Sequence, residues 1–340
     1  MAVMCETDVA GGVSRDSFSI IDAHCDTLLE IAGIGYESEH ETPPRDFFKN
    51  NDNAHLDLPK LLAGNVRCQI MALFCDDAQL DSVYEYTLEL IDIFEKLCVH
   101  SKGRFFPVLS AMDMDRAIPG DTVGAILSLE GAEALGPSAE HLLEFYARGI
   151  RAVGLTWNRR NAFARGVRGE GEGGLTEAGH RLVEQLEAMH IIIDASHLSD
   201  EAFWDLAQQA RRPFIASHSN ARAVYDHPRN LTDQQIKAVA DSGGAVGVVF
   251  VPNFISDESE ISYIDRLIDH IDHIVTVGGI ACAALGSDFD GFKDEPQRRV
   301  LADASQYPKL LEMLMRRGYS PSDVEKIASG NWERVIRDIL

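Results

Sequence analysis

The stretch "HIIIDASHLSDEAFWDLAQQARRPFIASHSN", residues 190–220, contains two apolar runs that flank a longer amphipathic segment. The runs "HIIIDASH" and "PFIASHSN" have the length and apolar character of strands that are buried on both faces, as in a parallel sheet. Between them, residues 198–212 predict a helix, and Ser199 stands where a helix N-cap is expected. The two predicted strands end at His197 and His218. This stretch therefore predicts a strand–helix–strand unit with an imidazole at the end of each strand.

The same alternation of apolar and amphipathic segments runs through the rest of the chain. We predict six further strands, at residues 19–26, 66–75, 122–131, 150–157, 244–251 and 280–291. Helical spacing or capping residues predict further helices at residues 82–100, 175–190, 231–244 and 262–279. Eight strand–helix repeats indicate an α/β fold, a (β/α)8 TIM-type barrel, with a doubly wound open sheet as the alternative. No linker marks a boundary, so we expect residues 1–340 to form a single catalytic barrel domain.

Two irregular segments follow predicted strands and so belong to the catalytic end of the barrel. Residues 35–59 form a polar, proline-containing insertion after the first strand. Residues 164–174, "ARGVRGEGEGG", follow the fourth strand and contain five glycines. The glycine-rich segment lacks the GK[ST] ending of a phosphate-binding loop. We therefore interpret it as a mobile loop near the site rather than a nucleotide cradle.

The overall charge excludes several classes of partner. The formal net charge is -23, and a surface this negative repels nucleic acid and anionic membrane surfaces. Residues 1–18 do not resemble a signal peptide, and no segment reaches the length of a membrane span. The six cysteines include no CxxC pair, so we expect reduced thiols and a cytoplasmic location.

The segment "IDAHCDTLLE", residues 20–29, places a histidine and an aspartate two residues apart at the end of the first strand. Side chains alternate along a strand, so His24 and Asp26 point the same way, with Cα atoms roughly 6.6 Å apart. A divalent metal would explain this pair. A buried, hydrogen-bonded His–Asp pair would explain it equally well.

The other strand ends help to decide between these explanations. Polar or aromatic residues close most of the predicted strands, and in a barrel these ends converge on one mouth. They are His24, Asp26, Glu130, Trp157, His197, His218 and Asp288. Imidazoles and carboxylates without thiolates suit zinc, and also manganese, iron or cobalt. Five of these residues would fill two metal sites if Glu130 bridges them. By contrast, we expect His270 and His273 to lie on a solvated helix face.

Several motifs occur together in the order found in a known family. They are "IDAHCDTL", "SLEGAE" at 128–133, "GLTEAGHRLVEQLEAMHIIIDASHLSD" at 174–200, "SHSNARAVYDHPRNLTDQQI" at 217–236, "LGSDFDGF" at 285–292 and "SGNWERV". Through them, essentially the whole chain resembles the membrane (renal) dipeptidase family of zinc metallopeptidases, a branch of the amidohydrolase barrels.

The resemblance implies a binuclear zinc site, with two Zn²⁺ per chain, that hydrolyses dipeptides, including those with a C-terminal D-residue. It implies that His24 and Asp26 bind one zinc ion, His197 and His218 the other, and Glu130 both. It also implies that Arg229 binds the substrate carboxylate, that Asp288 transfers protons, and that the chain forms a homodimer.

One position departs from the best-known members of that family. Their fourth-strand motif reads LTHxxN, in which the histidine contacts substrate, whereas this chain reads "LTWNRRN" with Trp157. Trp157 could be a pocket wall or part of the barrel packing. The structural alternatives for Arg229 and Asp288 are a surface ion pair and a hydrogen-bonded strand-end carboxylate. A related amidohydrolase acting on another small carboxylate-bearing amide, and a catalytically silent metal-binding homologue, are the alternative functions.

Overall fold

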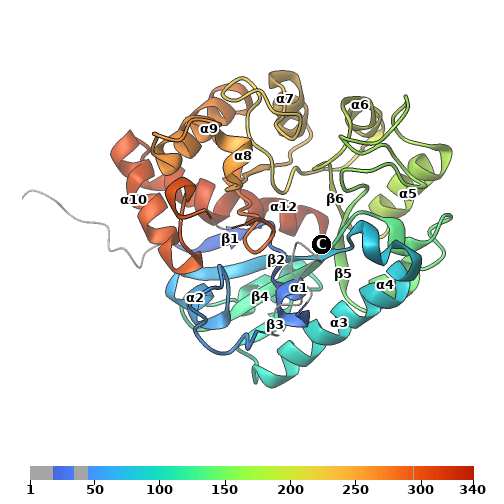
Figure 1. Cartoon of the computed structure of the whole chain (residues 1–340), viewed down its shortest axis with the longest axis horizontal. Coiled ribbons are helices and arrows are strands. Elements are labelled where there is room, and N and C mark those ends of the chain that lie inside the picture. Colours follow the sequence, from blue (N-terminus) through green and yellow to red (C-terminus); the bar gives the residue numbers. More distant parts are fainter. Residues whose placement is uncertain (1–17, 34–44, 294) are drawn as a thin grey trace, which may run out of the picture.

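The strands of the computed structural model, which describes residues 18–33, 45–293 and 295–340, form one parallel sheet. Neighbouring strands follow the order β6-β5-β4-β2-β1-β8-β7, and β3 pairs with β4 outside this path. Figure 1 labels β1 to β6. The strands are β1 (Ile20–Asp22), β2 (Val66–Phe74), β3 (Phe105–Pro107), β4 (Val123–Glu130), β5 (Ile150–Gly154), β6 (Ile192–Asp194), β7 (Val246–Val248) and β8 (Ala283–Leu285).

The segment at residues 213–220 closes the gap between β6 and β7. Ile215 pairs in parallel with Asp194 of β6, and Ala216 pairs with Val246 of β7. The segment is irregular, so it joins both neighbours through isolated bridges rather than a continuous strand. The sheet is thus curled into the predicted (β/α)8 barrel. The short β3 was not predicted, because three residues are too few to show a pattern.

Helices follow the strands and cover the outside of the sheet. They are α1 (Thr27–Ala32), α2 (Leu58–Ala63), α3 (Val83–His100), α4 (Leu142–Ala147), α5 (Glu177–Ala188), α6 (Asp200–Gln209), α7 (Asp233–Asp241), α8 (Pro252–Ile255), α9 (Tyr263–Gly278), α10 (Tyr307–Arg317), α11 (Pro321–Glu325) and α12 (Asn331–Ile339). The helices predicted near α3, α5, α6, α7 and α9 are confirmed. Thr176, Ser199 and Thr232 accept the N-terminal backbone hydrogen bonds expected of caps. Within the described segments, no helix is both long and apolar enough to cross a membrane.

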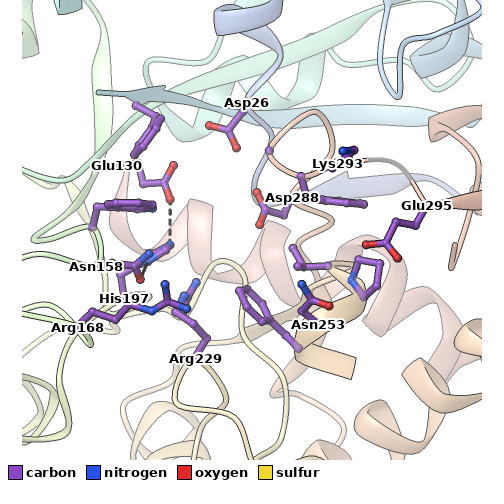
Figure 2. Close-up of a pocket in the computed structure, with 17 residues that line it drawn as sticks. Asp26, Glu130, Asn158, Arg168, His197, Arg229, Asn253, Asp288, Lys293 and Glu295 are labelled. Atoms are coloured by element: carbon purple, nitrogen blue, oxygen red, sulfur yellow. Dashed lines mark hydrogen bonds and ion pairs between the residues drawn. The ribbon is translucent and has the colours of Figure 1, made fainter. Parts of the chain in front are cut away.

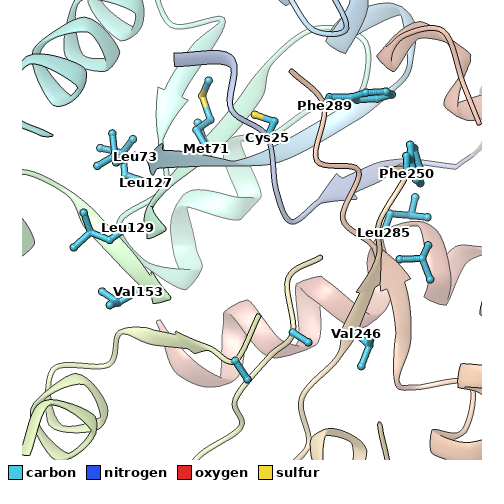
Figure 3. Close-up of a cluster of buried hydrophobic side chains, with 14 of the residues drawn as sticks. Cys25, Met71, Leu73, Leu127, Leu129, Val153, Val246, Phe250, Leu285 and Phe289 are labelled. Carbon is cyan, nitrogen blue, oxygen red and sulfur yellow. The ribbon is translucent and has the colours of Figure 1, made fainter. Parts of the chain in front are cut away.

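Side chains on each strand alternate between two apolar clusters. Outward-facing residues such as Leu127, Leu129 and Val153 pack under the surrounding helices (Figure 3). Inward-facing residues, among them Ile126 of β4, pack together at the N-terminal end of the barrel. Helix α12 covers that end, where the indole nitrogen of Trp332 donates to the Leu285 carbonyl at 2.8 Å. The opposite, C-terminal end is left for polar side chains.

The prediction for the histidines of α9 is wrong for His270. His270 is fully buried, accepts a hydrogen bond from the Ala221 amide at 3.1 Å, and donates to the Ile255 carbonyl. Its ring thus ties α9 to the segments that follow the barrel strands. Burial lowers the pKa of His270 to about 4, which keeps the ring neutral. His273 is partly exposed and pairs with Asp233 at 2.7 Å.

The insertion predicted at residues 35–59 lies partly outside the described residues, which resume at residue 45. In the described part, Phe47 and Leu56 are buried in the outer apolar cluster. Asp57 caps α2 by accepting the Lys60 amide at 3.0 Å. This part of the insertion is therefore anchored to the barrel.

The backbone of Gly286 lies directly against the segment at residues 213–220, which closes the barrel. A Cβ atom added there would lie 1.7 Å from the Ser217 carbonyl oxygen, which is backbone and cannot swing away. We expect Gly286→Ala to lower the free energy of unfolding by about 3 kcal/mol, because overpacking of this kind displaces the neighbouring strand. Urea unfolding followed by circular dichroism measures the change.

Gly330→Ala is the matched control. The nearest atom to its added Cβ would be the Glu325 carbonyl oxygen at 3.5 Å, an ordinary contact. This variant should be as stable as the wild type or slightly more stable, since alanine restricts the unfolded chain. Equal stability of both variants would contradict the close approach at Gly286.

Candidate metal centre

The predicted site residues gather at the C-terminal end of the barrel. They surround a cavity of about 270 Å³, shown in Figure 2. The cavity wall includes Asp26, Glu130, Trp157, His197, Arg229 and Asp288. His24 and His218 are buried beside it, with ring centroids 3.8 Å apart. The structure thus brings together side chains from β4 and from the segments that follow β1, β6 and β8.

Glu130 is at the centre of this group. Its Oε2 atom lies 3.3 Å from His24 Nε2. Its Oε1 atom lies 2.9 Å from His197 Nε2 and 3.7 Å from His218 Nε2. The two carboxylate oxygens therefore face different histidines.

Hydrogen bonds behind the histidines favour one tautomer for His197 and His218. Nδ1 of His197 lies 2.9 Å from the Asn158 carbonyl oxygen Oδ1, which can only accept. Nδ1 of His218 lies 2.7 Å from the Ser217 hydroxyl, and that hydroxyl donates to Asp194. Both Nδ1 atoms therefore carry the proton, and each Nε2 atom presents a lone pair to the cavity.

The Nε2 lone pairs of His197 and His218 face each other, and neither nitrogen carries a proton that could form a hydrogen bond between them. Nε2 of His197 lies 2.8 Å from Nε2 of His218, beside Glu130 Oε1. Nε2 of His24 and Oδ1 of Asp26 are buried and have no hydrogen-bond partner among the described residues. Buried polar atoms are rarely left in this state unless a further group binds them. The residues therefore fit a divalent cation, and the mixture of imidazole and carboxylate fits zinc.

The electrostatics of the cluster agree with this reading. Burial, then Arg229, lowers the pKa of His197 to about 3, and burial likewise lowers the pKa of His218. Burial opposes protonation of His24 too, but Glu130 and Asp26 outweigh it and raise the pKa of His24. Burial raises the pKa of Glu130, but His24 and His197 outweigh it, so the pKa of Glu130 is lowered. Glu130 therefore remains a carboxylate and His197 and His218 remain neutral, as metal ligands must be, whereas only a bound cation would oppose the protonation of His24.

Asp288 lies next to the group on a tightly turned backbone. Its Oδ1 atom is 3.8 Å from His24 Nε2, and its φ angle is +64°. His197 also has a positive φ angle, +70°. The backbone of Gly291 lies against Asp26 and Asp288, so closely that a Cβ there would be 2.2 Å from Asp26 Oδ2. Burial, followed by the charges of Asp26 and Glu130, raises the pKa of Asp288, an effect that bound cations would oppose.

Asp290, two residues beyond Asp288, belongs to a different environment. It accepts hydrogen bonds from the Thr27 hydroxyl at 2.8 Å, from Arg45 at 2.8 Å and from the His55 amide at 3.0 Å. It does not line the cavity. Asp290 therefore holds the segment that carries Asp288 in place.

Arg229 and Trp157 form parts of the cavity wall. Arg229 is buried, donates to the His218 carbonyl at 3.2 Å, and lies over the Phe254 ring at 5.5 Å. Trp157 packs against Phe74 with ring centroids 5.1 Å apart. Trp157 thus packs against the barrel and also contacts the cavity.

Four residues in or behind the site were not predicted from the sequence. Asn158, Ser217 and Asp194 set the tautomers described above, and Arg168 reaches the cavity from the glycine-rich loop. Metal-binding histidines usually have such partners, but the sequence does not reveal which residue is within reach.

Comparisons with known proteins point in one direction. Residues 14–340 match the family described as membrane dipeptidase, peptidase family M19. A Schizosaccharomyces pombe protein named as an uncharacterized dipeptidase is 32% identical over 344 residues, covering 94% of this chain and 80% of that protein. The crystal structure of dipeptidase AC, an M19 metallopeptidase, superposes with a TM-score of 0.83 at 27% identity, covering 95% and 99% of the chains. A Rhodobacter sphaeroides metallopeptidase, bound to a phosphinate mimic of L-Ala-D-Ala, gives 0.84 at 26% identity, covering 96% and 100%.

The Asp194–Ser217–His218 chain generates a testable expectation. Ser217→Ala removes the acceptor that holds the His218 proton on Nδ1, so zinc affinity should fall by about 10- to 100-fold. Competition with a chromogenic chelator measures that affinity without an activity assay. Ser219→Ala is the matched control, because the Ser219 hydroxyl is buried one residue beyond His218 and has no hydrogen-bond partner among the described residues. Wild-type affinity in Ser217→Ala would contradict the assigned tautomer.

Proposed function

Because this chain belongs to the membrane dipeptidase family (peptidase family M19) and is a metallodipeptidase, we propose how many metal ions it binds and which substrate it cleaves. In this proposal the chain binds two zinc ions and hydrolyses the amide bond of dipeptides, including those that end in a D-residue. The central observation is the position of Glu130, whose two oxygens face His24 on one side and His197 on the other.

The ligand assignment follows from that position. His24 and Asp26 would hold one ion, His197 and His218 the other, and Glu130 would bridge them. When bound, the two ions would activate a water molecule for attack on the amide carbonyl and stabilise the charge that develops there. The unpartnered Nε2 of His24 and Oδ1 of Asp26 support the first half of this assignment. The facing Nε2 atoms of His197 and His218 support the second half.

Asp288 is the proposed proton carrier. It lines the cavity 3.8 Å from His24, and no lysine or arginine of the described residues is paired with its carboxylate, so it can accept a proton and release it. As the carbon–oxygen bond to water forms, Asp288 would take the water proton. As the carbon–nitrogen bond breaks, it would pass that proton to the leaving amine.

Arg229 is the proposed anchor for the substrate carboxylate. Its guanidinium group is held on the cavity wall by the His218 carbonyl and the Phe254 ring. A planar guanidinium binds a carboxylate through two parallel hydrogen bonds, which fixes the orientation of the peptide. The ligand of the Rhodobacter metallopeptidase, a phosphinate mimic of L-Ala-D-Ala, supports a dipeptide with a free carboxylate and a D-residue here.

Metal analysis and a small substrate panel test the proposal. Protein purified without chelator should contain close to two zinc ions per chain. It should cleave free L,L and L,D dipeptides and leave their C-terminal amides intact, because the amides lack the charge that Arg229 binds. A fully active enzyme with one ion per chain would refute the bridging role of Glu130. Equal cleavage of the amides would refute the role of Arg229, and no turnover of any dipeptide would refute the activity.

Asp288→Asn isolates the proton transfer. The change preserves shape and removes the base, so the turnover number should fall by about 10²–10⁴-fold while zinc content and melting temperature stay near wild type. Asp290→Asn is the matched control. Its carboxylate has three structural partners, so we expect a lower melting temperature with normal turnover per metal-loaded molecule. Turnover within a few-fold of wild type in a metal-loaded Asp288→Asn variant would exclude Asp288 as the proton carrier.

A further inference from the structure

Two arginines reach the cavity on the side where His197 lies. Arg229 comes from the chain that follows the segment at residues 213–220, and Arg168 comes from the glycine-rich loop at residues 164–174 (Figure 2). Burial, then the charges of Arg229 and Arg168, lowers the pKa of His227 to about 4. Figure 2 shows the two side chains on the same side of the cavity, and both charges, together with that of Arg222, act on the same imidazole.

The backbone of Arg168 is fixed against the metal centre. The amide of Val167 donates to the His197 carbonyl at 2.7 Å, and the amide of Arg168 donates to the Asn158 carbonyl at 2.8 Å. Both acceptors belong to residues of the site, one a candidate zinc ligand and the other its hydrogen-bond partner. Arg168 is thus held at the rim of the cavity, although it belongs to a loop.

Its guanidinium group has no anionic partner within the described residues, whereas neighbouring arginines do. Arg165, three residues earlier, pairs with Glu201, and Arg222 pairs with Asp200 at 3.2 Å. No carboxylate of the described segments lies within ion-pair distance of Arg168, in a chain whose net charge is -23. The side chain is exposed and faces the cavity, so a substrate can reach it.

We propose that Arg168 binds a carboxylate on the side chain of the substrate's C-terminal residue, so that the preferred dipeptides end in aspartate or glutamate. This inference rests on the dipeptidase function proposed above, with Arg229 holding the α-carboxylate. An acidic C-terminal residue carries its two carboxylates a few bonds apart, which matches two guanidinium groups on one wall. Each guanidinium can then form its own paired hydrogen bonds.

Lys293 provides the competing explanation. It lines the same cavity, and Figure 2 shows it near Asp288, away from the two arginines. If acidic dipeptides were favoured only by the general positive charge of the cavity, Lys293 would contribute as much as Arg168. The two residues can therefore be compared directly.

The experiment measures kcat/KM of the zinc-loaded enzyme for Ala-Glu, Ala-Gln, Ala-Lys and Glu-Ala, with both L and D forms of the second residue. Wild type should prefer Ala-Glu to Ala-Gln. Arg168→Met should lower kcat/KM for Ala-Glu by about tenfold or more, and change Ala-Gln and Glu-Ala by less than about threefold. Arg168→Glu should reverse the preference in favour of Ala-Lys. Lys293→Met removes the same charge from the other side and should keep the ratio of Ala-Glu to Ala-Gln.

The outcomes distinguish a failure of the role proposed for Arg168 from a failure of the proposed dipeptidase function. Hydrolysis of Ala-Gln without any preference for Ala-Glu would overturn the role of Arg168 and leave the dipeptidase function standing. An equal loss of preference in Lys293→Met would also overturn it, in favour of general charge. Failure to cleave any of the peptides would instead refute the proposed function itself.

Discussion

The mutual repulsion of lone pairs around Glu130 is the constraint on which the rest of the site depends. Nε2 of His197 and Nε2 of His218 lie 2.8 Å apart with Glu130 Oε1 beside them, and none of these atoms carries a proton in the favoured tautomers. Such an arrangement has a high free energy in a buried, low-dielectric environment unless positive charge binds there. The protein must therefore hold these groups together against their own electrostatics, and a cation would reverse the sign of the interaction.

The barrel supplies the rigidity that this requires. Glu130 ends strand β4, which pairs with β2 from Gly124 to Glu130 and with β5 from Leu127 to Glu130. Ile126, which faces inward on the same strand, packs into the closed apolar end that α12 covers. Because the ligands come from separate strand ends, no single local movement can spread them apart. Repulsion at one end of the barrel is thus opposed by close packing at the other.

The sequence was informative wherever a local pattern determines the structure. Apolar runs located the eight barrel strands, and capping residues such as Thr176 and Ser199 located helix starts, because both effects act over a few residues. The convergence of His24, Glu130, His197 and His218 could also be predicted, since a barrel brings strand ends together.

Contacts between segments that are distant in the sequence could not be predicted in this way. His270 was expected on a solvated helix face because no strand end places it near the other candidate ligands, yet its ring contacts Ala221 and Ile255, which lie 49 and 15 residues away in the sequence. The same limit hid Asn158, Ser217 and Asp194, and it hid the structural role of Asp290.

The backbone angles at His197 and Asp288 have an evolutionary consequence. Both residues lie in the left-handed region, where a residue with a side chain beyond glycine costs of order 1 kcal/mol. Selection for stability alone would favour glycine there, because glycine has no Cβ atom and adopts that conformation without steric cost. Under the proposed function, keeping histidine and aspartate there trades folding stability for metal binding and proton transfer. In a descendant released from catalysis, these two positions would be among the first to drift, and their replacement would mark lineages in which the activity has been lost.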